Sequence, residues 1–91
     1  MQYAVTDNKD RHRFELEADG HLAFSEYKRE AGMITIVHTE VPKELGGRGI
    51  GTALAHGLME LIRAEGIKVK PLCPFVKAYI DKHPEYSGLV A

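Results

Sequence analysis

Apolar and polar residues alternate along the first half of the chain, and this two-residue period predicts β-strands. The pattern is clearest in Arg11–Glu17 and His21–Lys28, which flank an Asp19-Gly20 dipeptide typical of tight hairpin turns. Met33–Val41 is the most β-prone run in the chain and predicts a third strand, which Pro42 ends. Three consecutive strands indicate an antiparallel meander.

A weaker apolar run precedes this meander. Tyr3–Val5 predicts a short first strand, and the polar cluster Thr6–Asp10 predicts the turn that follows it.

The second half of the chain changes to a helical period. Apolar residues recur at helical spacing from Ile50 to Ile62, and Gly66 follows as a glycine cap, which predicts an amphipathic helix. Ile67–Leu72 predicts a short strand, and a right-handed crossover through the helix places it parallel to Met33–Val41.

Two prolines bound a second predicted helix, which begins at Pro74 and stops before Pro84. The tail Glu85–Ala91 is expected to be irregular. The pattern therefore predicts an α+β fold with a mainly antiparallel sheet, one βαβ crossover and two helices.

Composition narrows the function classes. A length of 91 residues fits a single domain spanning 1–91, and 12 basic against 13 acidic residues disfavour nucleic-acid binding. No apolar run approaches the roughly 18 residues of a membrane span. A single cysteine, Cys73, cannot form an internal disulfide, which favours a cytoplasmic location, and the scattered histidines lack the spacing of a metal site.

Glycines gather between the strongest predicted strand and the first predicted helix. The loop consists of Gly46, Gly47, Arg48, Gly49, Ile50, Gly51 and Thr52. Backbone amides and the helix dipole can bind an anion at such a junction, and glycines let a pyrophosphate approach the amides closely. The alternative is a flexible strand-to-helix connection. The spacing matches neither the Walker motif nor the dinucleotide fingerprint, which disfavours ATP and NAD.

Four motifs occur in an order that resembles a known family. They are the Asp19-Gly20 turn, His38-Thr39-Glu40-Val41-Pro42 before the glycine loop, Cys73-Pro74-Phe75 after the last strand, and His83-Pro84-Glu85-Tyr86. Together they resemble the small Yjdj-type branch of the GNAT superfamily of N-acetyltransferases.

The resemblance implies a site for acetyl-coenzyme A in which the loop amides hold the pyrophosphate. It also places Cys73 near the thioester of the coenzyme. Gly46 departs from the superfamily, whose phosphate loop usually opens with Gln or Arg, so Arg48 within the loop is a candidate to compensate. Full-size members carry helices between their first two strands, and their absence here implies an open acceptor side.

Three residues are candidates for the chemistry. His38 and Glu40 alternate along one strand and therefore share a face, where either could take a proton from an acceptor ammonium. Cys73 would lie at the start of a helix, which favours the thiolate and permits an acetyl-cysteine intermediate; the alternative is a buried, inert thiol. Direct transfer, with amides near Val41 polarising the thioester carbonyl, is the preferred mechanism.

Phe75 and Tyr79 lie one turn apart on the second predicted helix and could pack along the pantetheine arm, although such pairs are more often core residues. The sequence thus predicts an acetyl-CoA-dependent N-acetyltransferase acting on an amine of a protein lysine, an N-terminus or a polyamine. A non-catalytic coenzyme A binding module that works with a partner protein remains an alternative, as does a structural domain whose loop is only a turn.

Overall fold

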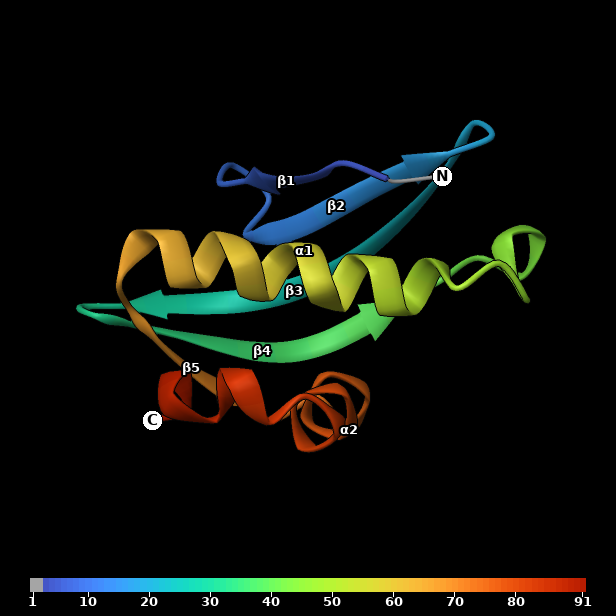
Figure 1. The fold of residues 1–91 in the computed structure, drawn as a ribbon. Helices are drawn as coiled ribbons and strands as arrows, with labels where there is room; N and C mark the ends of the chain where they lie inside the picture. The colour runs from blue at the N-terminus through green and yellow to red at the C-terminus, as the bar shows by residue number, and fades with distance from the viewer. Residues whose placement is uncertain (1–2) are drawn as a thin grey trace.

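A computed structural model describes residues 3–91 and shows five strands in one sheet, in the order in which they occur along the chain (Figure 1). The strands are β1 (Val5–Asn8), β2 (Arg13–Ala18), β3 (His21–Glu30), β4 (Met33–Glu40) and β5 (Lys68–Pro71). Neighbours pair antiparallel except β5, which pairs parallel to β4. The predicted meander and the parallel crossover are both confirmed.

The crossover helix α1 (Ile50–Glu65) lies between β4 and β5 in the chain, and α2 (Pro74–Lys82) follows β5. Two short 3-10 helices, η1 (Lys43–Leu45) and η2 (Pro84–Leu89), complete the described elements. The main helices confirm the predicted α+β fold class. Neither α1 nor α2, within residues 3–91, has the length and hydropathy needed to cross a membrane.

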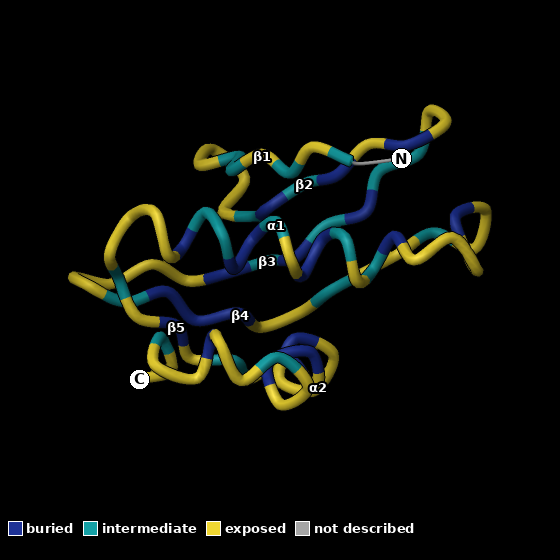
Figure 2. The backbone as a smooth tube through the Cα atoms, in the orientation of Figure 1, coloured by how far each residue is buried: buried dark blue, intermediate teal, exposed yellow. Residues whose placement is uncertain are grey.

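The hydrophobic core lies between one face of the sheet and the helices (Figure 2). Strand residues alternate between this face and solvent, as a two-residue period requires. The core side chains include Phe14, Leu16, Ala23, Ile34 and Ile36 from the sheet and Leu54, Leu58, Met59 and Ile62 from α1. On the other face of β2 to β4, glutamates and partly buried apolar residues alternate with this set. No helix of residues 3–91 covers that face.

The first strand differs from the prediction. Thr6, Asp7 and Asn8 were expected in a turn, but all three pair with β2, and the turn begins after Asn8. The side chains of Asp7 and Asn8 have partners that stabilise the extended form. Asn8 donates to Glu15 at 3.0 Å, and Asp7 accepts from Tyr27 at 2.5 Å.

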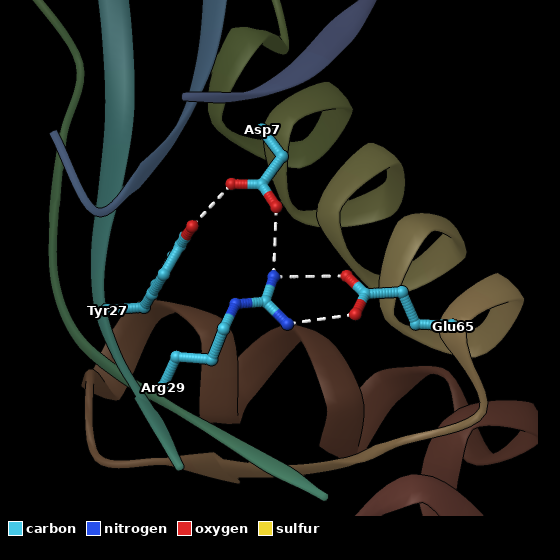
Figure 3. Close-up of polar contacts among 4 residues, drawn as sticks. All are labelled: Asp7, Tyr27, Arg29 and Glu65. Atoms are coloured by element: carbon cyan, nitrogen blue, oxygen red, sulfur yellow. Dashed lines mark hydrogen bonds and ion pairs between the residues drawn. The ribbon is translucent and has the colours of Figure 1, made fainter. Parts of the chain in front are cut away.

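Asp7 belongs to a cluster that joins β1, β3 and the end of α1 (Figure 3). The Arg29 guanidinium donates to Asp7 at 2.9 Å and to both carboxylate oxygens of Glu65 at 2.8 and 3.0 Å. Burial is the main cause that raises the pKa of the Tyr27 hydroxyl, and its hydrogen bond to Asp7 adds to the effect. This cluster attaches the short edge strand to the helix that covers it.

The C-terminal tail forms a 3-10 helix, in contrast to the irregular segment that the sequence predicts. Pro84–Leu89 forms η2, and Val90 makes an isolated parallel bridge with Val69 on the outer edge of β5. Tyr86 supplies the reason, because its ring is 1% exposed and its hydroxyl donates to Glu60 of α1 at 2.5 Å. A buried aromatic anchor therefore holds a segment that lacks helical or strand periodicity.

Candidate functional site

The glycine loop leads from η1 into the first turn of α1. Gly47 and Gly49 adopt left-handed conformations with φ of 78° and 70°, which glycine tolerates without the strain that a side chain would add. Within residues 3–91, no side chain caps the start of α1, and its first turn contains no acidic residue. The first amides of this helix are thus arranged for an external anion rather than for an internal cap.

Arg48 does not fold back over the loop that contains it. Its guanidinium forms an ion pair with Asp19 in the β2–β3 turn. Arg48 lowers the pKa of the Asp19 carboxyl, first through the hydrogen bond and then through its charge. The proposed compensation for Gly46 would therefore require Arg48 to share its donors with Asp19.

β4 and β5 separate next to this loop. β4 carries a bulge at Val37, because Tyr27 pairs with Ile36 whereas Glu26 pairs with His38. β5 pairs with β4 only as far as Ile36, whose carbonyl accepts from the amides of both Leu72 and Cys73 at 3.0 Å. Beyond Ile36, β4 continues without β5 at its side, which leaves an opening between the two strands.

His38 and Glu40 lie on the part of β4 that borders this opening. Their side chains are 53% and 61% exposed, and His38 Nε2 is 3.9 Å from Glu40 Oε1. The expectation that the two residues share one face is confirmed. Phe24 of β3 lies beside them, with its ring centroid 6.5 Å from that of His38.

Cys73 lies on the other side of β4, at the N-cap position of α2, and its side chain makes no capping hydrogen bond. The residue is 4% exposed, and its thiol donates to Thr39 Oγ1 at 3.3 Å. Thr39 is in turn hydrogen-bonded to the buried Ser25 hydroxyl at 2.8 Å. Cys73 is therefore close to the opening, but it does not face His38 or Glu40.

A pocket of about 140 Å³ lies between the first turn of α1 and the exposed side of α2, lined by Thr52, Phe75, Ala78, Tyr79, Lys82 and His83. Phe75 packs directly on Gly51, where an added Cβ would come within 2.7 Å of its ring. The Tyr79 hydroxyl is 3.3 Å from His56 Nδ1, and burial is the main cause that raises the pKa of Tyr79. Phe75 thus lies against the loop, whereas Tyr79 is buried next to His56 of α1.

The arrangement has the α+β fold that the sequence resemblance implies, and a comparison with family models agrees. Residues 13–89 match the model described as GCN5-related N-acetyl-transferase. The chain belongs to this family.

Two curated relatives are similar in sequence to part of the chain. Protein NATD1 of Xenopus tropicalis is 33% identical over 51 residues, which are 56% of this chain and 47% of the relative. NATD1 of Mus musculus is 31% identical over 52 residues, 57% of this chain and 47% of the relative. The aligned segment thus spans about half the length of these curated relatives.

A structural comparison covers more of the chain. A GCN5-like protein of Staphylococcus aureus, solved by NMR, superimposes with a TM-score of 0.71 at 28% identity. The match covers 96% of this chain and 86% of the other. The GNAT-like fold is therefore shown over nearly the whole length.

The candidate residues of this GNAT domain form two groups on opposite sides of β4. Loop residues 46–52, Cys73, Phe75 and Tyr79 lie on the helical side, whereas His38 and Glu40 lie on the open side. Sequence reasoning missed the hydrogen bonds that join Cys73 to Thr39 and Thr39 to Ser25, because no spacing signal links residues that are 34 and 14 positions apart. Within residues 3–91, no three His, Cys, Asp or Glu side chains gather as a metal site.

Proposed function

We propose that this GNAT domain is an acetyl-CoA-dependent N-acetyltransferase that acts on a primary amine of a protein lysine, an N-terminus or a polyamine. The observation that carries the proposal is the divergence of β4 from β5 beyond Ile36, on the stretch of β4 that carries the two proton acceptors and leads to the uncapped start of α1. The motifs of the chain further favour the Yjdj-type branch, and its single free cysteine fits a cytoplasmic location.

The residues present fit the coenzyme. Amides of the loop, from Gly46 to Thr52, would hold the pyrophosphate, because the start of α1 has no side-chain cap within residues 3–91. Phe75 and Tyr79 would cover the pantetheine arm from the pocket on α2. The coenzyme supplies an activated acetyl thioester when bound.

The chemistry then needs a base and hydrogen-bond donors. An amine attacks only after it loses its proton, and Glu40 or His38 would accept that proton on the open side of β4. Backbone amides from the bulge at Val37 to Val41 border the opening and would polarise the carbonyl under attack. No protein nucleophile is required for this direct route.

The alternative is a coenzyme A binding module that requires a partner protein. The exposure of His38 and Glu40, 53% and 61%, favours this alternative because a base in open water is not positioned or desolvated by its surroundings. A partner that covers β4 would supply the missing wall.

An acetyl-transfer assay against blocked lysine peptides, peptides with a free N-terminus, and spermidine tests the proposal. We expect Glu40→Gln or His38→Asn to lower kcat by about 10²–10⁴-fold, the usual range for loss of a general base, with unchanged binding of acetyl-CoA. Glu30→Gln is the control, since Glu30 lies at the opposite end of the same sheet. Transfer that is unaffected by both β4 variants would contradict the assignment, and coenzyme binding without transfer to any amine would support the partner-dependent module.

A further inference from the structure

The open face of the sheet carries a shallow groove that runs across four strands. One hollow, of about 280 Å³, is lined by Ala4, Thr6, Glu15, Glu17 and Leu22. A second, of about 170 Å³, is lined by Leu22, Phe24, Glu40, Val41 and Pro42. Leu22 lines both hollows, so the two adjoin at this side chain, and the second one reaches Glu40, the proposed base; we call the pair the groove.

Strand register explains why these side chains lie together. Thr6 pairs with Glu15, Glu15 with Phe24, and Phe24 with Glu40, so one row crosses the sheet from β1 to β4. Glu17 and Leu22 pair in the next row. Cross-strand partners point to the same face, so these rows give the groove an apolar floor and carboxylates along its length.

The charge of the groove has one sign. Its lining contains three glutamates and no Lys or Arg. Arg13 flanks the groove, where it donates to Glu15 at 2.6 Å and lies over the Phe24 ring at 4.5 Å. Glu15 is thus neutralised within the protein, whereas Glu17 forms no ion pair within residues 3–91 and remains available to a ligand.

We propose that this groove binds the acceptor as an extended, basic peptide that presents a lysine to Glu40. The proposal rests on the proposed function and narrows its acceptor to one class. Apolar contacts along Leu22 and Phe24 suit the aliphatic stems of long cationic side chains, whose charged ends then meet the carboxylates. A groove open along its whole length admits a chain that continues in both directions.

The geometry also sets the spacing of the recognised residues. Glu17 of β2 pairs with Leu22, and Glu40 of β4 pairs with Phe24, so the two glutamates are two strand spacings and two residues apart, which is about 12 Å. An extended peptide advances about 3.4 Å per residue and places every second side chain on the same face, so about four residues separate side chains that reach the two carboxylates. A second basic residue four positions from the acceptor lysine would therefore contact Glu17.

An NMR titration of the protein without coenzyme tests the groove directly. The probe is a blocked peptide with one lysine and an arginine four positions away, and the control peptide has glutamate in place of that arginine. We expect the basic peptide to perturb the amides of Thr6, Glu17, Leu22 and Phe24, and to bind about tenfold more tightly than the control peptide. Equal affinity of the two peptides, or perturbations elsewhere, would overturn the proposal.

Charge reversal distinguishes specific binding in the groove from general attraction between opposite charges. Glu17→Lys should weaken binding of the basic peptide and strengthen binding of the control peptide, so that the preference inverts. Glu44→Lys makes the same change in net charge on η1, outside the groove, and should leave the preference intact. A preference that inverts equally in both variants would overturn the proposal.

Two further outcomes distinguish this inference from the proposed function. Acetylation of the basic peptide without perturbation of the groove would overturn the groove and leave the transferase standing. Binding in the groove without transfer would contradict the transferase and leave a peptide-binding site. Spermidine binding as tightly as the basic peptide would show that the groove recognises charge alone, and would overturn the peptide class.

Discussion

At the scale of single residues, the environment of Cys73 argues for direct transfer. Its thiol donates to Thr39, which is itself hydrogen-bonded to Ser25. In the part of the chain that the structure describes, Thr39 is the only side chain within hydrogen-bond distance of the Cys73 sulfur. A cysteine nucleophile reacts as the thiolate and is usually activated by an adjacent base, which is not found at this position.

We therefore expect Cys73 not to accept the acetyl group. Intact-mass analysis after incubation with acetyl-CoA and no amine should show an unmodified protein. The Cys73→Ser variant provides the matched control, since Cys73 is the one cysteine of the sequence. An added acetyl group that disappears in Cys73→Ser would contradict this expectation and favour the covalent route.

Residue-level prediction succeeded where one element decides the geometry. His38 and Glu40 share a face because strand residues alternate, and the 3.9 Å contact between their side chains confirms it. Residue-level prediction failed where two elements that are distant in the sequence meet. The Arg48 ion pair with Asp19 joins a loop to a hairpin turn 29 positions earlier, and neither local pattern contains that information.

At the scale of elements, the attachment of β1 to α1 depends on charge. Arg29 lowers the pKa of the Glu65 carboxyl below its usual value of 4.5, while burial opposes the shift. Since the folded pKa lies below the unfolded one, this stabilisation is complete above pH 4.5. It is lost as the pH falls through the lower value of the folded protein.

Glu65→Gln removes this dependence. We expect the variant to be less stable at neutral pH by about 0.5–1 kcal/mol, which lowers Tm by about 2–8 °C in a domain of this size. The difference in stability between the variant and the unsubstituted protein should disappear as the pH falls below 4.5. Thermal unfolding across this range measures it, with Glu44→Gln of η1 as control. A difference that does not change with pH would contradict the role of the ion pair.

Element-level prediction was accurate for periodic segments and poor for segments held by particular side chains. The α1 period from Ile50 onward and the Gly66 cap gave the helix its observed bounds. The extension of β1 through Asn8 depends on bonds to Glu15 and Tyr27, and the order of η2 depends on Tyr86. These bonds join residues that are 7, 20 and 26 positions apart, so a local period does not reveal them.

At the scale of the whole molecule, helices cover one face of the sheet and leave the other open. The few residues between β1 and β2 form a turn, so the open face receives no cover from this connection. The predicted openness of the acceptor side agrees with the exposure of His38 and Glu40. The groove was not predicted, because it depends on the register of four strands.

Two matched variants test whether the glycine loop binds acetyl-CoA. Gly49 in the loop and Gly32 in the β3–β4 turn have φ of 70° and 72°, and an added Cβ at either would meet no atom within 4 Å. Valine therefore introduces similar backbone strain at both positions, but only Gly49→Val changes the anion site at the start of α1.

Calorimetric titration of the unsubstituted protein and both variants with acetyl-CoA is the most direct measurement. We expect saturable binding near one equivalent for the unsubstituted protein and for Gly32→Val, and no measurable binding for Gly49→Val. Absence of binding to the unsubstituted protein, or equal affinity of the two variants, would contradict the assignment of the loop as the coenzyme site.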